Sequence, residues 1–588
     1  MSPELMSPQK LLHSRERSLI LLCMILGLLV LVPILSKEVV IMLSKSFNKT
    51  LSEKGYGNFC RLFVGVLVAV IFLITGCTMV GPDFVKPEAP VQKEWMESRN
   101  PGIKIDVSDY KEWWSVFKDP VLNSLVEQAY QQNLPLQIAG IRILQARAQL
   151  GAVVGNLYPQ TQKGRGGADH TKISENAPNS LNSDDSFWQY NLGVDAAWEV
   201  DIWGKFRRAV ESGVANLETS IASYDDVLVS LTAEVARTYI LLRTFEERLE
   251  IARKNVGIQQ RSLEIAETRF NAGAVTELDV VQAKSLLRNT EAFIPRFEAA
   301  VRQAKNALAV LMGMLPGEID YMLSGPKLIP RTPPKVVVDI PAELLRRRPD
   351  IRLAEYQIAT QTPLIGVSKA ELFPAFQLFG SIGLASSNSR NTISGGLNGS
   401  SFSDLFESDS LEFFGGPSFS WNLFNYGRIK NQVRIEDALL QQLIVNYEDT
   451  VLRAHQEVED FLVGFLRTQE ESAILLDSVK ASQRSVDLSM LQYKEGLVDY
   501  QRVLDTQRFL TDQQDAWTAT RGNVVLNLVA MYKALGGGWQ IREGKEFVSK
   551  DNIEEMEKRT DWGNLIRPKA LETPATAEER KQWRWPDW

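Results

Sequence analysis

The sequence is poor in the side chains that most often perform catalysis or bind metals. Its 588 residues include three histidines and three cysteines, and no cysteine follows Cys77. His170 and His455 have no partners at metal-ligand spacing, and no Ser/His arrangement suited to nucleophilic attack occurs. We therefore expect no enzyme, no metal site and no dissociable cofactor. The net charge of −7 argues against a nucleic-acid partner.

The last cysteine, Cys77, stands at the end of a segment that is typical of an export signal. Residues 61–77 read RLFVGVLVAVIFLITGC, with basic Arg61, an apolar run over 62–74 and small residues before Cys77. The last four residues, ITGC, resemble the lipobox of bacterial lipoproteins, which implies cleavage before Cys77 and a covalent lipid on it. A plain transmembrane anchor is the alternative. Thr78 follows instead of aspartate, which favours sorting to the outer membrane.

A second apolar run precedes this signal. Residues 18–35 are long enough to span a membrane, although one export signal needs only one such run. Met42 begins a plausible basic start of a signal peptide. We therefore interpret 1–76 as a leader region and 1–41 as an overlong start.

The sequence repeats itself after 223 residues. WEVDIWGKFR at 198–207 matches WNLFNYGRIK at 421–430, and RFNAGAVTELDVVQAKSLL at 269–287 matches QYKEGLVDYQRVLDTQRFL at 492–510. The spacing is the same at both places, since 198 corresponds to 421 and 269 to 492. Two halves of equal internal length are therefore expected rather than a solenoid.

A long helix is predicted in each half. Apolar residues recur at alternating three- and four-residue steps from Leu228 to Phe270, and the second half keeps the same frame. A helix over 205–271 would be about 100 Å long at 1.5 Å per residue. Gly273 and Gly496 suit left-handed helix ends. Thr276 with Asp279 resembles a capping box, and Asp499 is the expected N-cap of the returning helix in the second half.

Alternating strands precede these helices. In 187–199 one face carries Trp188, Tyr190, Leu192, Val194, Ala196 and Trp198, whereas the other face is mainly polar. This alternation, with aromatics near both ends, is typical of a membrane β-strand. A second strand is expected over 414–423, with Trp421 near its end. Weaker partner strands follow Pro159 and Pro374, and polar loops at 170–186 and 385–410 separate the partners.

Four strands cannot close a membrane barrel by themselves. Unpaired backbone groups cannot face lipid, and small barrels need about eight strands. Two chains would supply eight strands and three would supply twelve. The fold class expected is thus an α+β membrane protein with a two-fold internal repeat, in which an oligomeric barrel continues into a helical coiled-coil tunnel.

Taken together, these motifs resemble the TolC-like outer membrane factors, specifically the lipoprotein branch of the OprM/NodT type. The resemblance covers roughly 77–540. It rests on the lipobox, WWSVFKDPVLNSLVEQAYQQNLPLQIAGIRILQARAQL at 113–150, LRRRPDIRLAE at 345–355, GVSKAELFPAF at 366–376 and the repeated segments above. It implies a homotrimer with a twelve-stranded barrel and a periplasmic tunnel. It also implies a periplasmic adaptor and an inner-membrane pump as partners, and passive exit of small molecules through the outer membrane.

Domain boundaries are expected from the repeat and from the resemblance. We expect a lipidated extended segment over 77–112, a first repeat over 113–313, a linker over 314–340, a second repeat over 341–540 and a tail over 541–588.

The resemblance also implies a gate at the helix tips. Asp505 takes the place of the family's inward-pointing acidic residue, and its repeat mate is Gln282. A ring of carboxylates favours the passage of cations, and carboxylates that lie close together raise one another's pKa. Asp279 and Arg502 occupy equivalent places and could pair between neighbouring hairpins. Gln501 stands where the family often has leucine. The expected adaptor contacts are Gly273, Ala274, Val275, Thr276, Gly496, Leu497, Val498 and Asp499.

Two other functions are compatible with parts of the pattern. A structural or adhesin-like lipoprotein with a coiled-coil stalk would form no oligomeric barrel. A membrane-anchored enzyme would need catalytic side chains that the sequence does not offer. The exported substrate stays open.

Overall fold

The computed structural model describes residues 79–566, apart from 107–109, 175, 177–183, 185, 326, 339–340 and 390–399. The chain divides into two units, Met1–Cys77 and Thr78–Trp588, and everything that follows concerns the second. The predicted leader, the lipidation site Cys77 and residues 567–588 of the predicted tail lie outside the described residues.

Two helices of 67 residues dominate this unit. They are α6 (Lys205–Asn271) and α11 (Arg428–Lys494), which begin and end at equivalent positions of the two halves. The prediction over 205–271 is confirmed. The predicted apolar seam of α6 is mostly buried, as at Leu228, Val235 and Leu242, whereas Phe270 at its end is 42% exposed. The repeated seam therefore packs as a coiled coil over most of its length.

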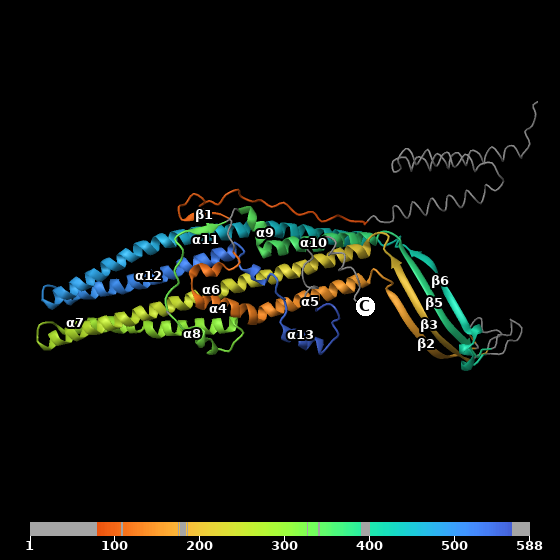
Figure 1. Ribbon diagram of the computed structural model, residues 1–588, viewed down its shortest axis with the longest axis horizontal. Helices are drawn as coiled ribbons and strands as arrows, with labels where there is room; N and C mark the ends of the chain where they lie inside the picture. Colours follow the sequence, from red (N-terminus) through yellow and green to blue (C-terminus); the bar gives the residue numbers. More distant parts are fainter. Residues whose placement is uncertain are drawn as a thin grey trace, which may run out of the picture. The chain divides into compact units, whose positions relative to one another are not determined.

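Each long helix turns back at its tip. In the first half the returning segment is α7 (Glu277–Glu291) followed by α8 (Phe293–Leu311), and in the second half it is the continuous α12 (Tyr500–Ala534). The break at 292 lies just before Pro295, which cannot donate to the carbonyl four residues earlier. The repeat mate of Pro295 is Thr518, which α12 accommodates. Figure 1 shows the two antiparallel hairpins side by side.

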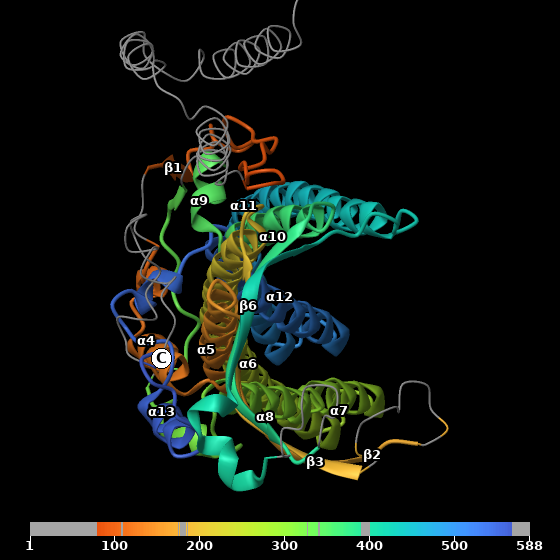
Figure 2. The ribbon, with the colours of Figure 1, turned by 90° about the vertical axis from the view of Figure 1, so that its right-hand side faces the viewer.

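Shorter helices fill the space beside the rods. They include α4 (Pro120–Gln132), α9 (Leu344–Arg347), α5 (Leu134–Gly155) and α10 (Pro349–Ala370), and the last two have 22 residues each. Asn133 starts α5 by accepting a hydrogen bond from the Leu136 N–H at 3.0 Å. Both α5 and α10 pack along α6, and α10 also contacts α11. Seen end-on, the helices follow an open arc (Figure 2).

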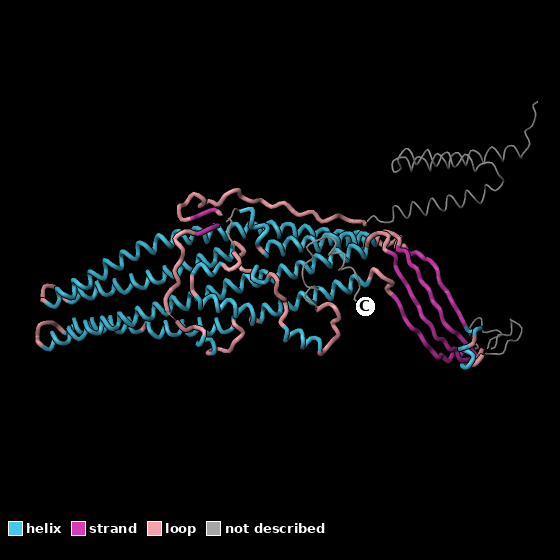
Figure 3. The backbone as a smooth tube through the Cα atoms, viewed as in Figure 1, coloured by secondary structure: helices cyan, strands magenta, loops and turns pink. Residues whose placement is uncertain are grey.

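Four strands form one antiparallel sheet in the order β2-β3-β5-β6. Their bounds are β2 (Thr161–Lys172), β3 (Ser186–Val200), β5 (Ala375–Ser387) and β6 (Leu411–Ser420). Figure 3 shows these strands grouped at one end of the helices. The strand expected over 414–423 is shifted, because Trp421 leaves the ladder and its indole Nε1 donates to the carbonyl of Leu372 at 3.0 Å.

The helical part has a buried core with aromatic and ionic contacts. Trp113 stacks on Tyr532 with ring centroids 5.3 Å apart. Asp225 is fully buried and forms ion pairs with Arg352, at 3.3 Å, and with Arg542. Arg542 belongs to the predicted tail, which therefore packs into the core as far as the structure describes it. In the part of the chain that is described, no helix is both long and apolar enough to cross a membrane.

The remaining elements are short. A parallel pair joins β1 (Ile103–Ile105) to β4 (Val336–Val338). The others are η1 (Trp113–Phe117), η2 (Glu318–Tyr321), η3 (Pro341–Glu343), η5 (Phe402–Phe406), η6 (Ser408–Ser410), η7 (Trp539–Arg542) and α13 (Lys550–Glu557).

Candidate functional site

The helix tips turn as the glycines predict, but one expected cap is absent. Gly273 and Gly496 have φ of +73° and +74°, the left-handed region that favours glycine. Asp499 caps α12 by accepting from the Arg502 N–H at 3.3 Å, as predicted. Within the described residues the Thr276 side chain makes no capping hydrogen bond. The capping-box prediction there is wrong, because only the Thr276 carbonyl reaches the Asp279 N–H.

The exposed tip residues lie together at the end of the two hairpins. Leu497 is 74% exposed, and Gly273, Ala274, Gly496 and Asp499 are exposed as well. Val275, Thr276 and Val498 belong to the same turns. Their role in contacting an adaptor stays a prediction.

Two of the predicted gate residues, Gln501 and Asp505, are joined by hydrogen bonds to each other and to Gln282, the repeat mate of Asp505. The Gln282 amide Nε2 donates to Gln501 Oε1 at 3.1 Å, and Gln501 Nε2 donates to Asp505 Oδ1 at 2.9 Å. Gln501 therefore orients the Asp505 carboxylate instead of forming an apolar ring. Because Gln282 lies on α7 and Asp505 on α12, this relay links the two hairpins next to the proposed gate.

Asp279 and Arg502 form no ion pair with each other within the described part of this chain. Burial and the Asp499 carboxylate raise the pKa of the Asp279 carboxyl, and the Arg269 guanidinium lowers it. Within this chain the cation that acts on Asp279 is therefore Arg269 and not Arg502. A pair between Asp279 and Arg502 of neighbouring subunits stays a prediction.

Arg269 is a tip residue that the sequence analysis missed. Its Nη1 donates to the backbone carbonyl of Tyr493, and its guanidinium lies 4.7 Å from the centroid of the Tyr493 ring. Tyr493 in turn packs edge-on against Tyr500, with ring centroids 5.3 Å apart. These contacts join the end of α6 to the end of α11. The signal was a break in the repeat at Arg269, whose mate is Gln492, whereas Tyr493 and its mate Phe270 are both aromatic.

A polar seam continues this junction away from the tips. Gln507 donates to Ser262 Oγ at 2.5 Å, and Asn255 donates to Gln514 at 2.9 Å. Farther along, Arg248 forms an ion pair with Asp515 at 2.7 Å. Polar contacts of this kind between α6 and α12 contrast with the apolar packing inside each coiled coil.

The sheet has one apolar and one mainly polar face. The apolar side chains of neighbouring strands are in register, as for Trp198 and Leu378 and for Val194 and Ile382. Many of them are exposed in the single chain, namely Trp188, Leu192, Val194, Leu378, Ile382, Leu411, Phe413 and Phe419. Such a surface is unfavourable in water and fits a lipid environment.

The aromatics predicted at the membrane boundary lie at opposite ends of the strands. Trp188 and Tyr190 stack near the loop end of β3, with an interplanar angle of 4°. At the helix end, Trp198 Nε1 donates to the Leu157 carbonyl at 3.2 Å, and Trp421 makes the equivalent bond to Leu372. Their placement in a membrane interface stays a prediction.

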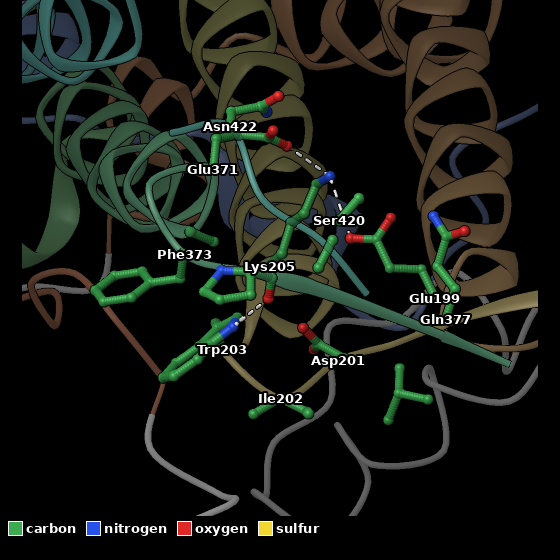
Figure 4. A pocket seen from close by; sticks show the side chains of 14 residues that line it. Glu199, Asp201, Ile202, Trp203, Lys205, Glu371, Phe373, Gln377, Ser420 and Asn422 are labelled. Carbon is green, nitrogen blue, oxygen red and sulfur yellow. Dashed lines mark hydrogen bonds and ion pairs between the residues drawn. The ribbon is translucent and has the colours of Figure 1, made fainter. Parts of the chain in front are cut away.

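Figure 4 shows a polar pocket where the strands become helices. Lys205 Nζ lies 2.6 Å from Glu371 Oε1 and 3.5 Å from Glu199 Oε1. Trp203 Nε1 donates to the Pro374 carbonyl at 2.8 Å, and its ring stacks on Phe373. These contacts fix the exit of β3 against the entry of β5, so the pocket is a junction between the two repeats.

The first described residues of the chain are held at the same junction. The Val80 N–H donates to the Trp203 carbonyl at 3.0 Å. Arg208, whose side chain is 2% exposed, pairs with Asp83 at 2.7 Å and with Glu211 at 2.8 Å. Gly204, with φ +80°, lies so close to Met79 that a Cβ there would be 2.9 Å from the Met79 Cα.

Comparison with known proteins agrees with this architecture. The model of the outer membrane efflux protein family matches residues 125–314 and 340–537. The chain is 28% identical over 481 residues to the probable outer membrane lipoprotein SilC of Salmonella typhimurium, with 80% of this chain and 98% of that protein covered.

Solved structures extend the comparison to the fold. The outer-membrane channel OprN is 32% identical with a TM-score of 0.72, and the match covers 78% of this chain and 99% of that one. The open state of the MtrE outer membrane channel of Neisseria gonorrhoeae is 26% identical with a TM-score of 0.63, over 79% and 99% of the two chains. The family model thus matches once in each half, and the two ranges cover more than half of the chain. This chain therefore belongs to the outer membrane efflux protein family and is an efflux channel protein of the outer membrane.

Proposed function

We propose that three copies of this chain form the exit duct of a tripartite efflux pump. In this duct small molecules pass from a periplasmic adaptor and an inner-membrane pump through the tunnel and the barrel. The observation that carries the proposal is the repeated strand–helix unit, whose sheet ends in two open edges, β2 and β6, in the single chain. Because a sheet in a membrane must close, further copies are needed to pair these edges.

The aromatic contact that joins the two repeats within one chain has an unused equivalent that could join neighbouring chains. Within the chain, Trp203 stacks on Phe373 with ring centroids 4.7 Å apart. The repeat mate of Trp203 is Tyr426, which is fully exposed. The mate of Phe373, one helix earlier, is Tyr158, because LYP at 157–159 corresponds to LFP at 372–374. Tyr426 of one subunit would therefore contact Tyr158 of the next.

Cross-linking tests this arrangement. The Tyr426→Cys/Tyr158→Cys variant should form disulfide-linked species up to a trimer on a denaturing gel after oxidation, and each single variant should not. A ladder that ends at the dimer, or continues beyond the trimer, would contradict the proposed stoichiometry.

A lipid on Cys77 would anchor the chain at the same level. The described chain starts two residues after Cys77, where Val80 is bonded to the β3–α6 turn. In this proposal the lipid enters the membrane beside the end of the strands, and the helices extend into the periplasm. The resemblance of SilC, named as a probable outer membrane lipoprotein, supports this anchor.

The gate is proposed at the tips, with Asp505, Arg502, Asp279 and Gln501 as its residues. Three Asp505 carboxylates near one axis would repel one another and attract cations. The Asp505→Ala/Arg502→Ala variant should raise the single-channel conductance of the purified protein in a planar bilayer. Unchanged conductance would refute the gate assignment, whereas no channel activity from the wild-type protein would favour a non-conducting stalk.

A further inference from the structure

The polar face of the sheet contains an ionic cluster to which no function has been assigned. Arg165 on β2 lies 3.4 Å from Asp195 on β3, measured from Nε to Oδ1. Its Nη2 is 3.2 Å from Glu412 Oε1 on β6 and donates to Ser381 Oγ on β5 at 3.0 Å. One arginine therefore contacts side chains from all of the other strands of the sheet.

Glycines make this reach possible. Arg165 is opposite Gly193, Gly193 is opposite Gly383, and Gly383 is opposite Glu412, so the four form one row across the sheet. A Cβ at Gly193 would lie 3.4 Å from Arg165 Nε and 2.8 Å from the Ile382 carbonyl oxygen. The two middle positions thus leave a shallow path in which the arginine side chain lies over the backbone.

The contact also shows how the sheet bends. On a flat sheet β2 and β6 would be three steps of about 4.8 Å apart, and side chains would stand perpendicular to it. Arg165 and Glu412 meet across this separation because their side chains converge, which places the polar face on the concave side. In a closed barrel the concave face is the inside, so the cluster would line the lumen.

The three charged side chains stay accessible to water. Arg165, Asp195 and Glu412 have side-chain exposures of 41%, 39% and 50% in the single chain. Gly193 is near the middle of β3, far along the sheet from the helix tips. The cluster is therefore separate from the gate at Asp505.

We propose that Arg165, together with Asp195 and Glu412, sets the ion preference of the barrel lumen. The proposal rests on the proposed function, since only an assembled barrel turns this face into a lumen. Three copies would form a ring in which Arg165 favours anionic groups and the two carboxylates favour cationic groups. Charged rings of this kind determine which ions pass a channel. Solutes carrying a carboxylate, phosphate or amine would be sorted here after passing the gate.

The ion preference can be measured from reversal potentials in a planar bilayer under a KCl gradient, with 0.1 M KCl on the dilute side. Arg165→Gln should raise the K⁺/Cl⁻ permeability ratio about sixfold, because one unit charge at about 8 Å in water changes the occupancy of each ion about two- to threefold, in opposite directions for K⁺ and Cl⁻. Glu412→Gln should lower the ratio by a similar factor. Both shifts should shrink in 1 M KCl, where the screening length falls to about 3 Å.

Three further variants separate charge from mere structure. Arg165→Lys keeps the charge but loses the forked geometry, so its ratio should stay near that of the wild type. Arg165→Gln/Glu412→Gln removes the whole contact with no net change of charge, and its ratio should also return toward the wild type. Lys172→Gln removes a positive charge from the opposite face of the same strand and should have little effect.

The outcomes divide clearly. Opposite shifts for the two single variants, with recovery in the double variant, support the proposal. If one single variant forms no channels, a shift in the other that the double variant reverses supports it as well. Equal ratios in all variants would overturn it while leaving the channel function intact. If Arg165→Gln, Arg165→Lys and the double variant all fail to form channels, Arg165 only holds the strands together and the proposal is overturned. A wild-type protein without channels would refute the proposed function, and the lumen ring with it.

Discussion

Replacing Arg269 with alanine should loosen the tips of the two hairpins. The wild-type guanidinium donates to the Tyr493 carbonyl at the end of α11 and lies over the Tyr493 ring. A hydrogen bond from a charged group contributes about 1.5–3 kcal/mol, and an exposed cation–π contact contributes about 0.5–1 kcal/mol. Allowing for overlap between the two, we expect a loss of about 2–3 kcal/mol per chain. This corresponds to about a 30- to 150-fold change in the ratio of joined to separated tips.

Single-channel recording in a planar bilayer measures this effect as open probability. The matched control is Gln492→Ala, which truncates the exposed repeat mate on α11. Arg269→Lys keeps a positive charge near the helix end and should give an intermediate result. If Arg269→Ala opens the channel no more than Gln492→Ala does, then Arg269 does not hold the tips together and the reasoning is refuted.

Three other predictions concern stability and anchoring. Burial, with the Asp350 carboxylate nearby, raises the pKa of the Asp226 carboxyl from 3.8 to about 6. The folded protein therefore binds this proton more tightly than the unfolded chain, so this stabilisation is fully present below about pH 4 and is lost as the pH rises through about 6. Asp226→Asn should accordingly raise the free energy of unfolding at pH 8 by up to about 3 kcal/mol, and with it the melting temperature. The same substitution should have little effect at pH 4. An equal gain at both pH values by calorimetry would contradict this. Gly204→Ala and Gly427→Ala both force a side chain into the left-handed region, at φ +80° and +82°, at about 1–2 kcal/mol. Gly204→Ala should cost more in thermal melts of the assembled protein, because its Cβ also meets Met79 whereas the nearest atom to a Cβ at Gly427 is Asn431 Nδ2 at 3.8 Å. Cys77→Ala should abolish the lipid mass on the mature N-terminus in intact-protein mass spectrometry, and a lipid-sized mass that persists would disprove the anchor assignment.

The long elements were predictable because their signals are repeated many times. The alternating three- and four-residue spacing of α6 continues from Leu228 to Phe270, so a single residue that departs from it does not obscure the helical pattern. The strands were also found, because alternation over β3 distinguishes its two faces. Equal lengths of the two halves supplied a second, independent check on the helix bounds.

Contacts between distant segments could not be predicted in the same way. The capping box at Thr276 failed because the local sequence allows the cap but does not require it. The end of β6 was misplaced because the Trp421 indole is drawn to the Leu372 carbonyl, a contact made only when two loops meet. Arg165 and Arg269 lie in ordinary polar stretches, and only the register of the sheet and the packing of α6 on α11 reveal their partners.

The equal helix lengths restrict how this protein can change by insertion or deletion. One residue added to α6 would move its tip by about 1.5 Å and rotate it by about 100°, out of phase with α11. A viable change of length would have to remove or add about seven residues in α6, in α11 and in both returning segments, 277–311 and 500–534. Because four matched edits are needed at once, the length of the helical rods should change far more rarely than the identity of their exposed residues.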